Sequence, residues 1–508
     1  MRRSLPVLVL LCIVFCLTSA LLAGPLEIGE QSGEAVSLGA ELPLWSVIPF
    51  IGILLSIAIF PLVAPEFWHH HFGKVSAFWA ILLGVPFVWS YGGEAMHEIL
   101  HTYLLDYIPF IILLWSLYTI AGGIWVQGAP VGVPLTNLVM LIIGTALASW
   151  IGTTGAAMVL IRPYIRMNQY RKSKVHLIIF FIFLVANIGG SLTPLGDPPL
   201  FLGFLHGVEF FWTFNIFSEM SLVAGTLLFV FFIWDSYMFR KEGWHEKIHL
   251  IDTHVDLPDD VEDQLVVEEE VEIENPTSHK MQEKTYRMNV QGLFNVLFLG
   301  GVIGGVLFSG KVHLGDVTVL GVHMQVENIV RDLFLILMGL CSLRFTPKAF
   351  RDGNDFNWFP IIEVAKLFAG IFITIIPALA MLRAGEAGQL RFVIDAVRHP
   401  SHYFWTTGAL SSFLDNAPTY LVFFNTALGK FGQTVEWLMS DGAHYLKAIS
   451  TGAVFFGAMT YIGNAPNFMV KSIAEQSSIK MPSFFGYMVF SLLILVPLFA
   501  LTTLVFFL

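Results

Sequence analysis

The sequence predicts an all-α polytopic membrane protein made of two inverted repeats, each with a re-entrant hairpin and an interrupted helix. Hydrophobic residues make up 56% of the 508 residues and charged residues only 13%, with a mean hydropathy of +0.71. Soluble domains usually carry about 25% charged residues. Apolar stretches of membrane-spanning length recur along the chain, and in each half glycine, proline and small polar residues break two of them.

The first segment of the chain is typical of protein targeting. Arg2 and Arg3 precede an apolar run from Leu5 to Leu17, which small residues follow up to Gly24. A positive start, a short apolar run and small residues near a cleavage site are typical of a signal peptide. We therefore expect residues 1–24 to be a signal peptide or an N-terminal anchor.

The first membrane repeat is expected over residues 25–239. A transmembrane helix needs about 20 mostly apolar residues. Such spans are predicted at 44–64, 75–93 and 104–125, followed by a broken region at 135–163, an interrupted span at 175–206 and a last span at 219–239.

Residues 240–288 differ in composition from the rest of the chain. They include fourteen acidic and six basic residues, and so account for most of the net charge of −11. An acidic segment with few aromatic residues cannot form a core of its own, so we expect an acidic cytoplasmic linker. The negative net charge also argues against a nucleic-acid partner, because nucleic-acid binding requires a basic surface.

The second membrane repeat, residues 289–508, has the same order of elements as the first. Spans are predicted at 290–309, 329–344 and 359–383, followed by a broken region at 404–429, an interrupted span at 446–475 and a last span at 484–508.

Basic loops give the orientation of the repeats. Residues 162–174 contain five basic residues and no acidic one, and residues 344–351 are also basic. Basic residues in short loops favour the cytoplasmic side, which places residue 25 outside and the linker inside. The first repeat then begins outside and the second begins inside, so the two repeats are inverted, which is a common plan of secondary transporters.

Short motifs support the repeat. Ser149–Gly155 aligns with Ser412–Pro418, and Thr193–Pro199 aligns with Thr460–Pro466, at nearly the same separation. Breaks of this kind free backbone groups that lipid cannot satisfy. They also place partly charged helix ends at membrane depth, where an ion can bind.

Two carboxylates in these motifs are the strongest candidates for the transport site, Asp197 and Asp415. An ionisable residue within the membrane normally belongs to an ion path or a proton relay. Hydroxyl and amide groups nearby suit a hard cation, although amide donors and helix N-termini also suit a carboxylate substrate. The remaining candidates are Thr153, Thr154, Thr193, Asn416, Thr419, Asn464 and Asn467.

A zinc-protease pattern is present elsewhere in the chain. His97-Glu98-Ile99-Leu100-His101 matches H-E-x-x-H, in which two histidines bind zinc and the glutamate acts as base. An intramembrane zinc metalloprotease is therefore a remote alternative. We expect this stretch to lie in a short outer loop between spans, and we predict a protein that is not an enzyme and has no resident metal.

The motifs at 189–199, 414–419 and 462–467 resemble those of the ion transporter superfamily. The resemblance extends over about residues 44–508, and it is greatest to NhaD-like sodium/proton antiporters and to the neighbouring citrate-transporter-like (CitMHS-like) group. It implies opposed re-entrant hairpins, an elevator-like movement and a homodimer, with Asp197, Asp415 and Asn416 in the transport site. Pro198 and Pro199 depart from the NhaD-like pattern, which has Val-Thr-Thr after Gly-Asp.

We therefore expect a secondary active transporter of the bacterial inner (plasma) membrane. The leading hypothesis is a Na⁺(Li⁺)/H⁺ antiporter without cofactors, in which the aspartates alternate between protonated and cation-bound states. The alternative is a cation-coupled citrate or dicarboxylate transporter. Expected partners are membrane lipid, a small cation with a proton or a carboxylate, and a second copy of the chain.

Overall fold

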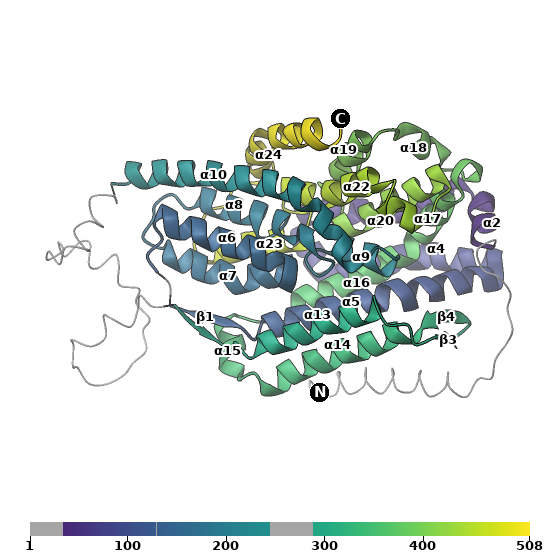
Figure 1. Cartoon of the computed structure of the whole chain (residues 1–508), viewed down its shortest axis with the longest axis horizontal. Coiled ribbons are helices and arrows are strands. Elements are labelled where there is room, and N and C mark those ends of the chain that lie inside the picture. The colour runs from purple at the N-terminus through teal and green to yellow at the C-terminus, as the bar shows by residue number, and fades with distance from the viewer. Residues whose placement is uncertain (1–33, 129, 244–287) are drawn as a thin grey trace.

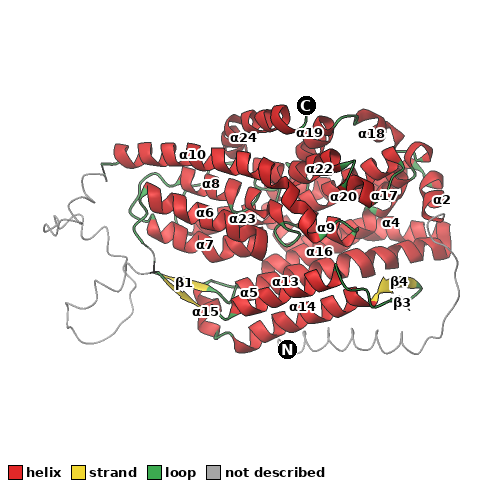
Figure 2. Ribbon diagram, in the orientation of Figure 1, coloured by secondary structure: helices red, strands yellow, loops and turns green. Residues whose placement is uncertain are grey.

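The computed structural model describes residues 34–128, 130–243 and 288–508. The expected signal peptide or anchor at 1–24 lies outside the described residues, as does nearly all of the acidic linker. Figures 1 and 2 show an almost entirely helical molecule in which most helices run along its long axis.

The first repeat begins after the short helix α2 (Glu34–Glu41). Its first three long helices are α3 (Ile48–Val63), α4 (Pro65–Thr102) and α5 (Ile108–Ala121), with a π-helical turn η2 (Tyr103–Tyr107) between the last two. The rest of the repeat consists of α6 (Pro134–Ile151), α7 (Thr153–Met167), α8 (Val175–Leu184), η3 (Ile188–Leu192), α9 (Pro198–Leu205), η4 (Phe210–Ile216) and α10 (Phe217–Lys241).

The second repeat follows the same order. It starts with α13 (Asn295–Ser309), α14 (Val326–Phe345), α15 (Lys348–Gly353) and the bent pair α16 (Phe359–Thr374) and α17 (Ile376–Arg383). It continues with η6 (Gly385–Ala387), α18 (Arg391–Ala396), α19 (Pro400–Ser411), α20 (Asn416–Phe431), α21 (Val435–Met439), α22 (Ala443–Phe456), η7 (Gly457–Met459), α23 (Ala465–Gln476) and α24 (Phe484–Phe506).

Two short antiparallel ribbons lie at opposite ends of the molecule, and the sequence analysis did not predict them (Figure 2). Strand β1 (Trp125–Gln127) pairs with β2 (Asn289–Gln291), which joins the end of α5 to the start of the second repeat. Strand β3 (Asp316–Val319) pairs with β4 (Val322–Gln325) between α13 and α14. We call the end with β1 and β2, where α10 also ends, the linker side, and the other end the far side.

The helices group into two packed units (Figure 1). In the first, α4 packs on α3 and α16, and α5 packs on α13 and α14. In the second, α20 packs on α9 and α22, and α23 packs on α7 and α8. We call α3–α5 with α13–α17 the frame, and α6–α10 with α19–α24 the hairpin unit. The hairpins α6–α7 and α19–α20 enter from opposite sides, which confirms the predicted inverted arrangement.

The lengths of the helices agree with a polytopic membrane protein. Within the described residues, six helices are long and apolar enough to cross a membrane, or seven with the pair α16–α17, which is bent by 44°. The segment from α4 through α5 counts as one of these six although it runs over 57 residues.

The prediction of an outer loop around residues 94–103 is wrong. Instead of a loop, Gly92 alone has non-helical torsion angles, φ 57° and ψ −125°, and the chain is helical again immediately afterwards. Glycine adopts a positive φ without a steric penalty, so one residue is enough to reverse the chain. His97, Glu98 and His101 therefore lie on a helix that continues through η2 into α5.

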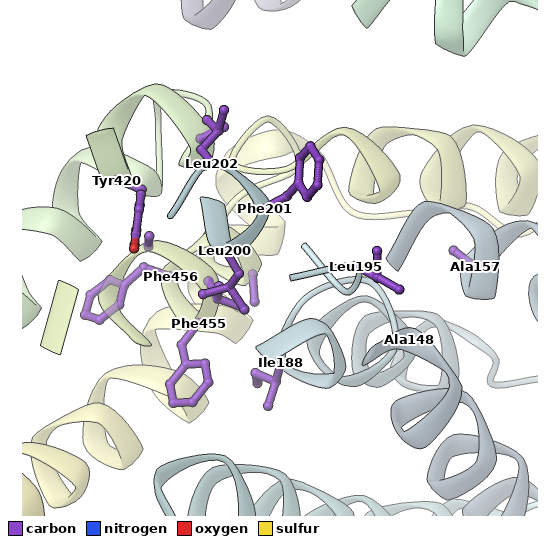
Figure 3. Packing of buried hydrophobic residues seen from close by; sticks show 14 of the residues in the cluster. Ala148, Ala157, Ile188, Leu195, Leu200, Phe201, Leu202, Tyr420, Phe455 and Phe456 are labelled. Carbon is purple, nitrogen blue, oxygen red and sulfur yellow. The ribbon is translucent and has the colours of Figure 1, made fainter. Parts of the chain in front are cut away.

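Aromatic and aliphatic side chains of both repeats pack around the helix breaks. Figure 3 shows Ile188 and Leu200 of the first repeat near Phe455 and Phe456 of the second, and Leu195 further away toward Ala148. Each of the six is at most 3% exposed. Because these side chains exclude water and lipid, polar groups at the breaks must find their partners within the protein.

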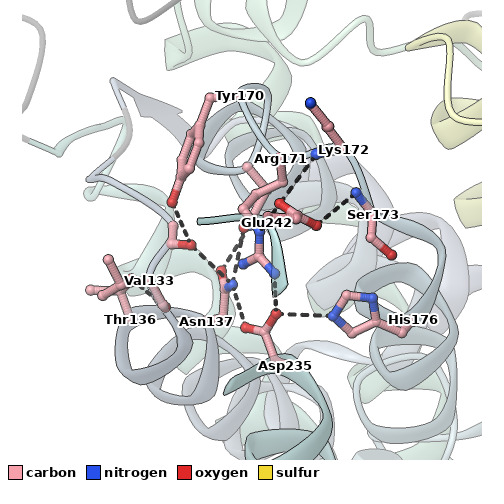
Figure 4. A network of polar contacts seen from close by, with 12 residues as sticks. Val133, Thr136, Asn137, Tyr170, Arg171, Lys172, Ser173, His176, Asp235 and Glu242 are labelled. Carbon is pink, nitrogen blue, oxygen red and sulfur yellow. Dashed lines mark hydrogen bonds and ion pairs between the residues drawn. The ribbon is translucent and has the colours of Figure 1, made fainter. Parts of the chain in front are cut away.

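A buried ion-pair network closes the base of the first hairpin on the linker side (Figure 4). Arg171 Nη2 lies 2.9 Å from Asp235 Oδ1, and Arg171 Nε lies 3.0 Å from Glu242 Oε2. His176 Nε2 lies 2.9 Å from the same Asp235 oxygen, and Asn137 Nδ2 donates to Asp235 Oδ2 at 2.9 Å. The network therefore ties α10 to the hairpin and to the start of α8.

Arg171→Met should lower the free energy of unfolding by about 3 kcal/mol, because it leaves the buried Asp235 carboxylate without its guanidinium. The measurement is the unfolding temperature of the purified protein in detergent. Arg391→Met is the matched control, since Arg391 and Asp395 pair at 3.4 Å with both side chains more than half exposed, and such pairs contribute at most about 1 kcal/mol. Equal destabilisation by both variants would contradict the importance of the network.

Candidate functional site

The tip of the first hairpin contacts the break in the first interrupted helix. Gly152, with φ 79° and ψ 149°, joins α6 to α7, and the positive φ explains a glycine at this turn. The backbone N–H of Thr153 donates to the carbonyl of Gly196 at 2.9 Å. The tip and the break therefore form one polar region inside the hairpin unit.

A pair of equivalent threonines satisfies both breaks in the same way. Thr193 Oγ1 donates to the carbonyl of Ser149, and Thr460 Oγ1 donates to the carbonyl of Ser412 at 2.5 Å. Each hydroxyl also accepts a backbone N–H from its own break, Leu195 N at 3.1 Å and Gly463 N at 3.1 Å. This shared geometry supports the alignment of the two motifs, although the two sequences share few identical residues.

All four motifs converge on the carboxylate of Asp197. Thr153 Oγ1 of the first hairpin and Asn464 Nδ2 of the second break donate to Oδ1 at 3.1 and 3.0 Å. Asn416 Nδ2 of the second hairpin donates to Oδ2 at 2.5 Å. Asp197 is 1% exposed, and the three donors are at most 3% exposed. The carboxylate is thus held by neutral donors from both repeats.

Asparagines connect the two breaks behind this carboxylate. Asn187 Nδ2 donates to Asn467 Oδ1 at 2.7 Å, and Asn467 Nδ2 donates to the carbonyls of Gly457 and Thr460 at 2.7 and 2.9 Å. Asn464 Nδ2 lies 3.3 Å from Asn187 Oδ1. Asn187 was not among the predicted site residues, although an isolated amide in an apolar span was the signal that could have identified it.

Asp415 lies at the tip of the second hairpin and does not contact Asp197 directly. It is the N-cap of α20, where Oδ1 accepts from Ala417 N at 3.1 Å. Its carbonyl accepts from Thr419 Oγ1 at 3.0 Å, and the residue is partly exposed. Asp415 therefore caps α20 at a partly exposed position on the hairpin tip.

The structure thus brings together four of the nine predicted site residues around one carboxylate, namely Thr153, Asp197, Asn416 and Asn464. Asn467 is connected to Asn464 by two hydrogen bonds that meet at Asn187. Thr193 satisfies backbone groups of the break, and Asp415 and Thr419 interact within their own hairpin tip. Thr153, and not Thr154, donates to Asp197.

The charge of this cluster has no counter-ion among the described residues. No lysine, arginine or histidine forms an ion pair with Asp197 or Asp415 there. Asn416 Oδ1 is also buried without a hydrogen-bond partner in this part of the chain. A buried carboxylate beside a free carboxamide oxygen is a set of acceptors suited to a proton or a hard cation.

Prolines reduce the number of amide donors at the broken helix ends. Asp197 and Asn464 are the N-caps of α9 and α23, and Pro198, Pro199 and Pro466 occupy the first helical positions. Proline has no backbone N–H, while anion binding at a helix N-terminus depends on such groups. The helix ends next to Asp197 are therefore poorly equipped to hold a carboxylate.

The zinc-protease alternative finds no further support. The rings of His97 and His101 lie 6.2 Å apart between centroids and are tilted by 42°. Among the described residues, however, no group of three or more His, Cys, Asp or Glu side chains has an arrangement that could hold a metal ion.

Inverted repeats with broken helices that meet at a buried polar site define the class of secondary transporters. A family model described as "Putative citrate transport" matches residues 39–507. The chain belongs to this family, which confirms the resemblance to the citrate-transporter-like group and favours a transporter over an enzyme. A comparison with curated proteins gave no match.

Thr193→Val and Thr460→Val should each lower the free energy of unfolding by about 1–3 kcal/mol, because each leaves a buried carbonyl and a buried N–H unpaired. Valine keeps the shape of threonine, so the loss reports the hydroxyl. Unfolding temperatures in detergent measure the effect, with Thr154→Val as the control that should change little. Near-zero shifts for both variants would contradict the role given to the threonine pair.

Proposed function

We propose that the protein is a Na⁺(Li⁺)/H⁺ antiporter in which Asp197 binds either the cation or the proton. The observation that carries the proposal is the buried Asp197 carboxylate, which has three neutral donors and no basic partner among the described residues. An isolated charge in such surroundings is unfavourable unless it is neutralised. A proton and a cation each neutralise it, and they exclude one another.

The surrounding groups supply the ligands that a cation requires. Sodium prefers oxygen ligands, as other hard cations do. At the site, oxygen ligands come from the Asp197 carboxylate and from the carboxamide oxygen of Asn416. Rotation of the Thr153 hydroxyl or of the Asn464 amide would bring further oxygens toward the cation. Asp415, at the partly exposed tip of the second hairpin, is the carboxylate that receives the cation on its way in or out.

Transport requires that the site opens to each side in turn. We propose that the hairpin unit moves against the frame as an elevator, with loaded and empty sites favouring different positions, since a ligand shifts a population only by differential affinity. The basic loops support an orientation in which the linker side faces the cytoplasm and the chain spans a bacterial inner membrane. On this proposal the frame also forms the contact of a homodimer.

Asp197→Asn should abolish cation-dependent proton movement, because the amide can neither release a proton nor neutralise a cation. The measurement is the collapse of ΔpH in everted membrane vesicles after addition of Na⁺ or Li⁺. The wild-type chain should respond to both cations, and Asp415→Asn should respond roughly tenfold more weakly or not at all.

Thr154→Val is the matched control for this assay, because Thr154 lies next to Thr153 and makes no hydrogen bond to Asp197 in the structure. It should exchange like the wild-type chain. Full exchange by Asp197→Asn, or a wild-type chain that responds to neither cation, would refute the antiporter proposal.

A second candidate function is cation-coupled uptake of citrate or a dicarboxylate, and one cavity favours it. The cavity measures about 270 Å³ and lies between Pro61 and Leu62 of the frame and Tyr461, Lys471 and Glu475 of the hairpin unit. Lys471 and Glu475, one helical turn apart on α23, form an ion pair at 2.7 Å. A substrate carboxylate could displace Glu475 and bind Lys471, which lies near the second break. A carboxylate site at this place agrees with the description of the family.

Lys471→Met distinguishes the two candidates, because Lys471 is the one basic side chain among the described residues that line this cavity, and methionine keeps the length of the side chain. Uptake of labelled citrate should fall roughly tenfold if Lys471 receives a carboxylate, which corresponds to about 1.4 kcal/mol. Exchange of Na⁺ for H⁺ should be unchanged. Glu475→Gln is the control, and it should not reduce citrate uptake. Absence of citrate uptake by the wild-type chain would exclude this second candidate.

A further inference from the structure

A titratable ion pair crosses the boundary between the frame and the hairpin unit. Asp106 lies in η2 of the frame, and His206 directly follows α9 of the hairpin unit. His206 Nε2 lies 3.3 Å from Asp106 Oδ1, and the two side chains are only 15% and 9% exposed. The pair is therefore largely shielded, and it joins two parts of the molecule that the proposed transport cycle moves apart.

Other ionisable groups surround this pair on the far side of the molecule. His101 of α4 and Arg383 of α17 both interact electrostatically with Asp106, and His101 also interacts with His206. Arg383 Nε donates to Asn425 Oδ1 of α20 at 2.5 Å, in keeping with the packing of α17 on α20. Asp106 is the acidic member of this group and His206 is its direct partner.

Glu98 and His97 lie further along the same helix. Glu98 interacts electrostatically with both Arg383 and His97. The helix that carries the H-E-x-x-H pattern thus places a row of ionisable groups between the far side and the Asp106–His206 pair.

The remaining elements around His206 contribute neutral groups. The ring of Phe424 of α20 lies 6.1 Å from the imidazole. In η2, the Tyr103 and Tyr107 hydroxyls donate to the carbonyls of Ala369 and Ala365 of α16, at 2.6 and 3.0 Å. The charge of His206 is thus balanced mainly by Asp106.

The boundary is built differently on the linker side. Arg162 Nε of α7 lies 3.1 Å from Asp355 Oδ2 of the frame, and Arg166 Nη2 donates to the carbonyl of Val126 at 2.6 Å. Arginine stays charged at every physiological pH, whereas histidine changes its charge between about pH 5 and 8. The contact that can change its charge with pH is therefore the Asp106–His206 pair on the far side.

We propose that Asp106 and His206 form a proton-binding site that holds the hairpin unit against the frame. When His206 is protonated, imidazolium and carboxylate attract each other across the boundary. When it loses the proton, the attraction weakens and the hairpin unit is released. Because only the protonated imidazole carries the charge that Asp106 attracts, a lower pH on the far side shifts the population toward the held position.

This inference rests on the movement in the proposed function, so its test measures movement without measuring transport. Spin labels are attached at Val63→Cys of the frame and Phe485→Cys of the hairpin unit, both 75% exposed, after replacement of the three native cysteines by serine. Distances between the labels are then recorded by pulsed electron paramagnetic resonance in lipid nanodiscs from pH 5.5 to 8.5. One distance should dominate at pH 5.5, and a second should grow as the pH rises.

His206→Gln should remove this transition, with both distances present at every pH, and Asp106→Asn should do the same. His444→Gln, which changes an exposed histidine at the start of α22, is the matched control and should keep the transition. A distance distribution of the wild-type chain that does not change with pH would overturn the proposal. So would a pH transition that persists in His206→Gln, or one that disappears in His101→Gln. Failure of Na⁺/H⁺ exchange in vesicles would refute the proposed function alone, because the distances still report the movement.

Discussion

The constraint on which the rest of the structure depends is that lipid cannot satisfy a backbone hydrogen bond. Two helices are broken near the middle of the hairpin unit, and each break frees several N–H and C=O groups. The first hairpin supplies partners for its break, because Ser149 Oγ donates to the Gly189 carbonyl and accepts from Leu192 N. In return, the Thr193 and Thr460 hydroxyls of the breaks donate to the hairpin carbonyls of Ser149 and Ser412. Each hairpin and its interrupted helix are therefore mutually dependent, and this dependence explains why both occur in each repeat.

The same constraint brings the four polar motifs to one point. Once the breaks are satisfied, their N-cap residues face each other across the repeat boundary, and Asn464 donates to Asp197 at 3.0 Å. Asp197 and Asn464 are only 1% and 3% exposed, so water has little access to this point. A buried carboxylate is stabilised by any ligand that neutralises its charge. The packing that satisfies the two breaks therefore also creates the site that can bind a proton or a cation.

Much of this arrangement could be predicted from the sequence, because glycine, proline and small polar residues are conspicuous within apolar spans. The two repeats, the two hairpins and the two breaks were predicted in this way. The sequence could not show that a single residue, Gly92, replaces the expected outer loop, since the same glycine inside an apolar stretch is compatible with a continuous helix. Nor could it rank Asp197 above Asp415 or reveal the link through Asn187, because both depend on distances between segments about 270 residues apart.

The two repeats agree in backbone geometry but differ in charge, and this difference limits what the site can bind. Asp197 and Asn464 occupy equivalent N-cap positions, both with extended backbone angles. An aspartate at both positions would place two carboxylates in contact, and such a pair resists ionisation of both members. Asn464 instead offers a donor to the single charge. The centre therefore holds one negative charge, and on the proposed mechanism it exchanges one proton for one monovalent cation, with Asp415 outside this centre.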